Sequence, residues 1–337
     1  MVLSRCWRSL LTALLLCWVS ESWGANAYQT NFKAHYCQAG LTCNVYWPMD
    51  ETAGTTLNNV CGQVCGAASA ASYNMTTSGS PLLNQTGVNG SRGTSVNFVS
   101  ASTQYAEAHS NGSGTGPGDV SRNWTEGCWV KPTSVGSDQV FFSTNNGTGT
   151  GADTTVWENL TRTTNKYSWR ARTPTSDGNF LYESVGSTTS LSNGVWYFLT
   201  TDFHTATQGA ALYVNGTQES TAVPIPAQPD PEAIIYYDFG RENRTAPLYF
   251  DGNLQDCFVV SSIIDVSSLY CLGVGTCNQD DWPYTVKLDV PKFRDNGWMD
   301  KLLARGYVTG LFSGKALVPN ILGPYLPLAA MLPGNAK

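Results

Sequence analysis

Charged side chains and histidine are scarce in this chain. Charged residues make up 13% of its 337 residues, and the only histidines are His35, His109 and His204. Histidine is the usual general acid or base near neutral pH, so its scarcity argues against histidine-dependent catalysis. The formal net charge is −6, and the body of the chain has no basic surface, so nucleic acid is not an expected partner.

Short motifs that mark common enzyme classes are also missing. The sequence contains no Gly-x-Ser-x-Gly, no His-Glu-x-x-His and no phosphate-binding glycine loop. These motifs normally supply a nucleophile, a metal site or a phosphate cradle. Their absence favours a binding or structural protein over an enzyme.

The chain lacks an apolar run long enough to cross a membrane. Two arginines precede an apolar stretch of ten residues, Leu10–Val19, which is too short for a span. Small residues then predict cleavage after Gly24, so residues 1–24 read as a secretory signal peptide. Four prolines interrupt the second apolar stretch, Ala316–Gly334, so no transmembrane segment is predicted. The expected location is extracellular, either secreted or associated with a cell surface.

Cysteine is present in an even number once the signal peptide is removed. Eight cysteines remain, which fits an oxidising compartment and up to four disulfides. They are Cys37, Cys43, Cys61, Cys65, Cys128, Cys257, Cys271 and Cys277. Local pairs are one option, with Cys61–Cys65 closing a small loop and Cys37–Cys43 or Cys271–Cys277 as further local pairs. A zinc site is disfavoured, because no second close pair follows at zinc-finger spacing.

Sequons for N-glycosylation are abundant in the body of the chain and absent after residue 243. The nine asparagines are Asn74, Asn84, Asn89, Asn111, Asn123, Asn146, Asn159, Asn215 and Asn243. Behind a signal peptide, so many sequons predict a secreted glycoprotein whose body is well exposed.

One hairpin is especially clear in the sequence. Trp196–Phe203 and Ala210–Val214 read as strands, since their aromatic and β-branched residues suit a half-buried pleated surface. The second strand ends in Asn215-Gly216, a strong hairpin signal, because a type I′ turn needs positive φ at both central residues. Asn215 also begins a sequon, so its side chain is expected to point to solvent.

Short strands at regular spacing continue along most of the chain. Residues 28–43 read as a short polar lead, and residues 61–93 and 222–232 read as loops rich in Gly, Ser, Asn or Pro. Because no long helix interrupts the strands, the sequence predicts an all-β fold built as an antiparallel two-sheet sandwich.

Six sequence landmarks occur in the order of one known family. They are 46–54 (YWPMDETAG), Phe98 with 104–107 (QYAE), 128–132 (CWVKP), 196–202 with 212–216, 249–260, and 265–273 (DVSSLYCLG). Together they resemble the laminin-G-like, concanavalin A-like lectin jelly-roll family. The resemblance implies a jelly roll over residues 44–277, preceded by a cysteine-containing lead at 25–43 and followed by an extension at 278–337.

The resemblance also implies disulfides, because it places distant strands side by side. If Trp129 and Phe258 face the core, alternation puts Cys128 and Cys257 together on the other side of their strands, which makes them the leading pair. The first and last strands of such sandwiches also meet, so Cys43 is expected to pair with Cys271 or Cys277.

Family members often bind calcium or a ligand at loop carboxylates, and calcium takes about six to eight oxygen ligands. The candidates here are Asp50, Glu51, Asp251, Asn253 and Asp256. Val99-Ser100 stands where the family has Asp-Gly, which removes one expected ligand, and ordinary turn residues are the competing interpretation. Calcium is therefore a candidate ion, and no cofactor is expected to be required.

Trp124 and Trp157 lie in polar, sequon-bearing surroundings and are candidates for stacking on sugars. The competing interpretation is that they are partly buried residues at the edge of the sandwich.

The same jelly roll also hosts glycosidases. Retaining members need two carboxylates about 5–5.5 Å apart, which predicts a pattern close to Glu-x-Asp-x-x-Glu on one strand. This chain has no such pattern, so we expect no enzymatic activity. A polysaccharide-cleaving enzyme therefore ranks third, after the two non-catalytic hypotheses given below.

Charge divides the chain into two parts. Residues 25–281 hold ten basic and twenty-one acidic residues, a net of −11, whereas residues 282–337 hold seven and three, a net of +4. A basic, apolar tail beside an acidic body favours self-association through residues 282–337, and folding back on its own domain is the equal alternative. The first functional hypothesis is a lectin-like module that binds glycan or glycoprotein in adhesion or recognition. The alternative is a structural subunit of an extracellular coat or filament.

Overall fold

The computed structural model describes most of the predicted sandwich. The described residues are 27–37, 44–61, 73–88, 93–109, 117–118, 122–145, 155–172, 181–183, 186–206, 209–220, 223–224, 234, 236–243 and 246–276. The following predicted features lie outside them: the signal peptide, residues 278–337, Cys43, Cys65, Cys277, Asn89, Asn111 and Asn146. The chain divides into two compact units, Met1–Val274 and Gly275–Lys337, and every element below belongs to the first. None of the helices in the described part is long and apolar enough to cross a membrane.

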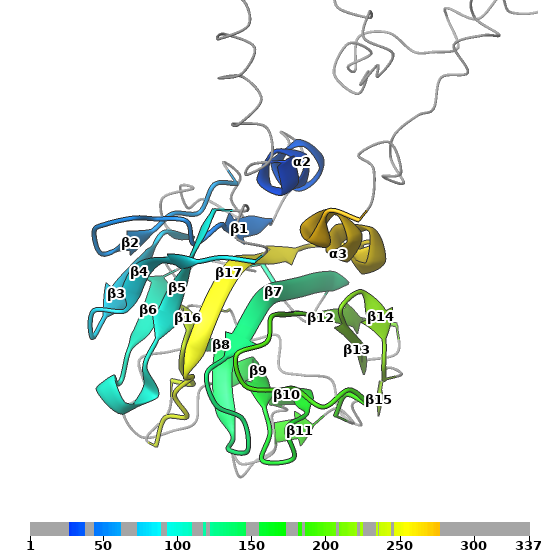
Figure 1. Ribbon diagram of the computed structural model, residues 1–337. Helices are drawn as coiled ribbons and strands as arrows, with labels where there is room; N and C mark the ends of the chain where they lie inside the picture. Colours follow the sequence, from blue (N-terminus) through cyan, green and yellow to red (C-terminus); the bar gives the residue numbers. More distant parts are fainter. Residues whose placement is uncertain are drawn as a thin grey trace, which may run out of the picture. The chain divides into compact units, whose positions relative to one another are not determined.

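Two antiparallel sheets form the body of the protein (Figure 1). Sheet A has the order β14-β13-β12-β7-β17-β5-β4, with β1 beside β17 and β15 beside β13. Its strands are β1 (Val45–Trp47), β4 (Leu82–Thr86), β5 (Thr94–Phe98), β7 (Trp124–Pro132), β12 (Tyr197–His204), β13 (Gly209–Val214), β14 (Thr217–Gln218), β15 (Val223–Pro224) and β17 (Gly252–Val260).

Sheet B has the order β11-β10-β9-β8-β16-β6-β3-β2. Its strands are β2 (Thr56–Leu57), β3 (Met75–Ser78), β6 (Tyr105–His109), β8 (Gln139–Asn145), β9 (Thr155–Thr161), β10 (Tyr167–Arg172), β11 (Leu181–Glu183) and β16 (Tyr236–Phe239). The helices are α2 (Ala27–Tyr36), the 3-10 helix η2 (Ser100–Ser102) and α3 (Val266–Val274). The all-β, antiparallel two-sheet prediction is confirmed.

Alternate side chains of both sheets meet in an aromatic core. Trp124 stacks on Trp157 and on Phe203, with ring centroids 5.2 and 5.3 Å apart. Trp47 meets the rings of Phe142 and Phe239 edge to face. Such aromatic pairs contribute about 0.5–1.5 kcal/mol each beyond the apolar area that they bury. The core is therefore held by rings from strands far apart in the sequence.

Helix α2 was not predicted, because residues 28–43 read as a polar lead. The structure shows a helix in which Tyr28, Phe32 and Tyr36 are all buried. Residues four apart share one helix face, so these three rings form a stripe. Phe32 packs against Tyr46 and Phe258 of sheet A, with centroids 4.4 and 4.9 Å apart. The aromatic stripe is the sequence signal that was missed.

Both long helices pack on the outer face of sheet A (Figure 1). Tyr270 of α3 stacks on Trp129 of β7 at 5.7 Å, and it also lies against Phe198 of β12. The middle of sheet A, at β1, β7, β12 and β17, is consequently buried on both faces, by the core on one side and by α2 and α3 on the other.

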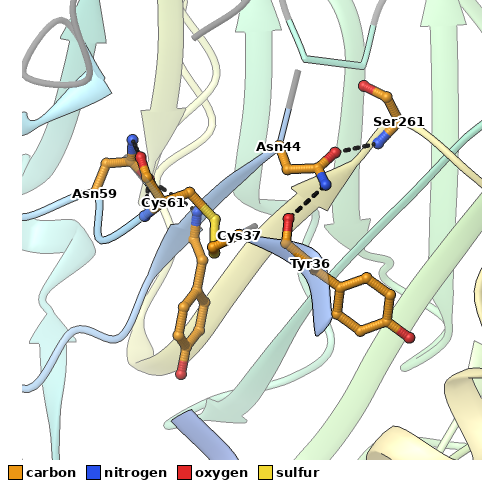
Figure 2. Close-up of a disulfide and its surroundings, with 7 residues drawn as sticks. Tyr36, Cys37, Asn44, Asn59, Cys61 and Ser261 are labelled. Carbon is orange, nitrogen blue, oxygen red and sulfur yellow. Dashed lines mark hydrogen bonds between the residues drawn. A yellow bond between two sulfur atoms is a disulfide. The ribbon is translucent and has the colours of Figure 1, made fainter. Parts of the chain in front are cut away.

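The end of α2 is tied to the body by a disulfide, Cys37–Cys61 (Figure 2). Beside it, the Asn44 side chain donates a hydrogen bond to the Tyr36 carbonyl and accepts one from the Ser261 N–H, at 2.6 and 2.8 Å. The prediction of a local Cys61–Cys65 loop is wrong, as is the alternative Cys37–Cys43 pair. Helix α2 brings Cys37 back over the sheet to Cys61, which the sequence did not indicate.

Cys128 and Cys257 are joined in a second disulfide, the pair ranked first from the sequence. The faces were assigned the wrong way round, however. Both cysteines lie in the core between the sheets, whereas Trp129 lies beneath α3. A bulge between Gln255 and Phe258 keeps Cys257 on the inner face. Cys271 is also disulfide-bonded.

Three strands lie in segments that were predicted as loops. β3 and β4 occupy part of residues 61–93, and β15 occupies Val223–Pro224. The turn at Asn215-Gly216 is confirmed, with φ of 52° and 75°. A Cβ on Gly216 would lie 2.9 Å from the Ser267 Cα, so the packing of α3 also requires glycine there.

Truncating the central ring of α2 should destabilise the protein. Phe32 is 0% exposed, and Phe→Ala changes in a core cost about 3–5 kcal/mol. We expect Phe32→Ala to lower the free energy of unfolding in urea by that amount. Lys33→Ala, on the exposed side of the same helix, should change it by less than about 0.5 kcal/mol. Equal effects from the two variants would contradict the docking of α2 on sheet A.

Candidate functional site

A row of polar residues crosses the outer face of sheet B. Directly opposed residues of antiparallel strands place their side chains on the same face. One continuous row of opposed residues runs from β3 to β10: Thr76, Glu107, Asp238, Ser143, Glu158 and Arg170. Their neighbours Ala106, Tyr237 and Trp169 point into the core instead. The row therefore presents acidic and basic groups on the side of sheet B away from the core.

The centre of this row is a buried carboxylate, Asp238, with its partners. Arg241 Nε donates to Asp238 Oδ1 at 2.8 Å, and Asn145 Nδ2 donates to Asp238 Oδ2 at 2.8 Å. Arg241 Nη2 also pairs with Glu107 Oε2. The Asp238 side chain is fully buried, and Glu107 is the most accessible of the three charged groups, at 31% exposed. One guanidinium thus bridges two carboxylates from neighbouring strands.

Burial governs the ionisation of this cluster. It raises the pKa of Asp238 to about 7, although the Arg241 charge pulls in the opposite direction. Burial also opposes the charge on Arg241, but the Asp238 carboxylate, Tyr105 and Glu107 together outweigh that effect and raise the pKa of Arg241. The guanidinium therefore stays charged, while Asp238 titrates near neutral pH.

Two tyrosines and a histidine surround the charged cluster. The Arg241 guanidinium carbon lies 3.4 Å from the ring centre of Tyr105, a close cation–π contact. His109 and Tyr236 are directly opposed on β6 and β16, and their rings meet edge to face at 4.6 Å. Both tyrosines are half-buried and His109 is exposed. We call this group the β6–β16 site; it consists of Tyr105, Glu107, His109, Asn145, Tyr236, Asp238 and Arg241.

Sequence reasoning missed every residue of the β6–β16 site. A signal was present in β6, where Tyr105, Glu107 and His109 alternate with two alanines. Such alternation predicts one polar and one core-facing side. The partners on β16 follow more than a hundred residues later, so only the strand pairing brings the two strands together.

A second ion pair lies farther along the same row. Glu158 and Arg170 are opposed on β9 and β10, and the guanidinium of Arg170 pairs with the Glu158 carboxylate. The Glu158 side chain is fully buried and that of Arg170 is 12% exposed. The charges of this pair cancel, so it adds no net charge to the face.

The two tryptophans predicted to stack on sugars do not lie at the surface. Trp124 and Trp157 are both 0% exposed and stack on each other in the core between the sheets. The Trp157 indole N–H donates to the Gly118 carbonyl at 3.1 Å. Core packing leaves no ring face for a ligand, so this prediction is wrong.

The five candidate calcium ligands bond separately to different neighbours. Asp50 accepts from the Gln29 amide at 3.0 Å, and Glu51 accepts from Asn58. The remaining bonds are Ser134 to Asp251, Asn253 to Ser95 and Tyr46 to Asp256. Within the described ranges, no three His, Cys, Asp or Glu side chains form a group that could hold a metal ion.

Asn159 was predicted as a glycosylation site, and the structure contradicts this. The residue is 2% exposed, and its Nδ2, the atom that would carry the glycan, donates to Glu126 Oε1 at 2.6 Å. Its Oδ1 accepts from the Tyr167 hydroxyl at 2.6 Å. Burial raises the pKa of Glu126 well above its usual value, although the hydrogen bond from Asn159 acts in the opposite direction. Asn159 is therefore a buried residue whose side chain connects Glu126 to Tyr167 through hydrogen bonds.

Other described sequons differ in their exposure. Asn84 and Asn123 are exposed. Asn215 is half-buried, and its Oδ1 accepts from the Phe198 N–H at 2.9 Å, so its side chain turns back toward β12 instead of into solvent. Asn74 similarly accepts from the Asn59 N–H, and Asn243 is half-buried beyond β16.

The structure also brings two acids together that the sequence pattern did not. Glu107 and Asp238 are directly opposed on β6 and β16. The expected Glu-x-Asp-x-x-Glu pattern describes one strand, whereas this pair comes from two. Arg241 bonds to both carboxylates, and Asp238 is fully buried. A glycosidase needs an acid and a nucleophile that both reach the substrate, and this arrangement leaves only Glu107 accessible.

Two antiparallel sheets, one covered by helices and the other bearing a polar face, define a lectin-like jelly roll. Residues 100–266 match the model of the concanavalin A-like lectin/glucanases superfamily, laminin G type. This part of the chain belongs to that superfamily, and it contains the whole β6–β16 site. No curated protein matches the sequence.

Several solved structures are similar to this one at low sequence identity. Domain 4 of the GH43 extracellular arabinanase AbnA from Geobacillus stearothermophilus, in complex with arabinotriose, is 12% identical with a TM-score of 0.49, over 68% of this chain and 98% of that one. The CBM40 of the Ruminococcus gnavus IT-sialidase, bound to α2,3-sialyllactose, is 16% identical with a TM-score of 0.38, over 45% and 83%. Trypanosoma rangeli sialidase is 13% identical with a TM-score of 0.46, over 71% of this chain and 33% of the sialidase.

The burial of Asn159 predicts an empty sequon. In a host that N-glycosylates secreted proteins, we expect Asn84 and Asn123 to carry glycans and Asn159 to carry none. Enzymatic glycan release in water labelled with heavy oxygen, followed by peptide mass spectrometry, marks each formerly occupied asparagine. The exposed sequons are the internal positive control. A label at Asn159 in the folded, secreted protein would contradict its place in the core.

The titration of Asp238 predicts a pH-dependent stability. The unfolded carboxyl has a pKa near 3.8 and the folded one near 7. Between these values the unfolded state has released the proton that the folded state still holds, so stability falls as pH rises. The free energy of unfolding of the wild type, minus that of Asp238→Asn, should therefore decrease from about pH 4 to about pH 7. A difference that is flat over this range would show that Asp238 is ionised throughout.

Proposed function

We propose that the protein is a secreted, non-catalytic lectin-like protein that binds glycan, alone or on a glycoprotein, through the β6–β16 site. The observation that carries this proposal is the pair of half-buried tyrosines, Tyr105 and Tyr236, beside fixed polar groups on the outer face of sheet B. Sugars have apolar ring faces and hydroxyl-bearing edges. A surface that combines aromatic rings with a few convergent polar groups suits such ligands.

The two sheets differ in a way that supports this choice of face. The part of the outer face of sheet A that lies under α2 and α3 carries aromatic rings, as the Phe32 and Tyr270 contacts show. The outer face of sheet B carries charged residues and tyrosines instead. A ligand therefore meets polar, preoriented groups on sheet B and helices on sheet A.

Secretion of the protein is part of the proposal. Two disulfides are described, Cys37–Cys61 and Cys128–Cys257, and Cys271 is in a third. Stable disulfides form in oxidising compartments. The N-terminal signal-peptide pattern and the exposed sequons at Asn84 and Asn123 point the same way.

The position of Arg241 supports a site that binds glycan without a metal ion and without cleaving it. Its guanidinium lies between Glu107 and Asp238 and supplies the positive charge that a cation would otherwise supply. Both carboxylates are held in ion pairs, so neither is placed as a free nucleophile. We therefore expect glycan binding to survive EDTA treatment and polysaccharides to remain uncut.

Removing the ring of Tyr236 should weaken glycan binding if the β6–β16 site holds the sugar. On a glycan array, Tyr236→Ala should weaken binding about tenfold or more, equal to about 1.4 kcal/mol, because the ring supplies contact area at low entropic cost. Tyr213→Ala is the matched control, since Tyr213 is a half-buried tyrosine on the outer face of sheet A; it should bind as the wild type does. Loss of binding in both variants, or in neither, would contradict this site. Release of sugar by the wild type would contradict the non-catalytic role.

A further inference from the structure

We infer that the β6–β16 site selects uncharged glycans and disfavours anionic ones such as sialylated or sulfated glycans. This inference rests on the proposed function and names the class of ligand. It follows from the arrangement of charges around Arg241 and from the hydrogen-bonding character of the groups that reach the surface.

The arginine that could attract an anion is already engaged. Arg241 donates through Nε to Asp238 and through Nη2 to Glu107, and its flat face covers Tyr105 at 3.4 Å. Its side chain is only 12% exposed. An anionic sugar would have to displace a carboxylate from this guanidinium. The displaced carboxylate, especially the fully buried Asp238, would then be left without its charge partner, which is costly.

The sum of charges also disfavours an anion. Above neutral pH, Glu107 and Asp238 supply two negative charges against the single positive charge of Arg241. Arg170, the next arginine along the row, pairs with the buried Glu158. An incoming carboxylate or sulfate would therefore meet a net negative site, and charges at close range interact strongly where water is partly excluded.

The accessible groups suit a ligand that donates hydrogen bonds. Glu107 is 31% exposed beside the guanidinium, and an ionised carboxylate only accepts hydrogen bonds. Sugar hydroxyls are donors and would satisfy it without bringing a charge. Tyr236 offers part of its ring to an apolar sugar face, since it is half-buried. Both features favour a neutral sugar with free hydroxyl groups.

The test uses the full-length protein at about pH 8, which is above the pKa of Asp238. Glycans are presented in pairs that differ only by a terminal sialic acid or a sulfate group. We expect the neutral member of each pair to bind at least about tenfold more tightly, a difference of about 1.4 kcal/mol. Raising the salt concentration from about 0.05 M to about 0.5 M should narrow this ratio, because salt screens charge repulsion.

A substitution in the β6–β16 site tests whether the preference for neutral glycans arises there. Glu107→Gln removes one negative charge and should lower the ratio several-fold. Glu51→Gln, at a half-buried glutamate outside the site, should leave the ratio unchanged. The salt titration uses the wild type, so it still tests whether charge repulsion causes the preference for neutral glycans if Glu107→Gln fails to fold. Equal or tighter binding of the anionic members would overturn this inference alone. Failure to bind any glycan would overturn the proposed function, and this inference with it.

Discussion

The buried ion pair between Asp238 and Arg241 organises the outer face of sheet B. Removing such charges from water costs several kcal/mol each, which is recovered only through well-aligned contacts. Here Arg241 meets Asp238, Glu107 and the ring of Tyr105 at once, so its side chain is held in a single orientation. Groups that are fixed before a ligand arrives lose less entropy on binding. The Asp238–Arg241 pair therefore preorganises the polar groups of the β6–β16 site for binding.

Aromatic packing on and between the two sheets supports this surface. Sheet A has the core on one side and the aromatic residues of α2 and α3 on the other. Between the sheets, tryptophan and phenylalanine rings fill the space, and Asn159 links Glu126 to Tyr167 inside it. The β6–β16 site differs from these regions because its tyrosines and Glu107 reach solvent at the edge of a buried charge cluster.

The sandwich itself could be predicted because its signals are local. The Asn215-Gly216 turn and the alternation of short strands depend on neighbours in the sequence, and both are confirmed. The face of a strand was harder to predict where both faces are buried. On β7, Trp124 and Cys128 point into the core while Trp129 lies under α3, so apolar residues occupy both sides. This double burial explains why the cysteine face was reversed. Trp124 was taken for a surface residue because its neighbours in the sequence are polar and include a sequon.

The site could not be predicted, because it depends on contacts across long separations. Glu107 and Arg241 are 134 residues apart, and no local pattern indicates that they meet. The search for paired acids considered one strand at a time and therefore missed Glu107 with Asp238. In the same way, a sequon is defined by three residues and contains no information on burial, which is why Asn159 resembled its exposed counterparts.

The most direct test of the account is a crystal structure of the protein with a bound neutral oligosaccharide. The account predicts a sugar ring against Tyr236 on the outer face of β6 and β16, with a hydroxyl donating to Glu107 and the Arg241–Asp238 pair intact. A sugar bound at another surface, or one that breaks the Arg241–Asp238 pair, would contradict it.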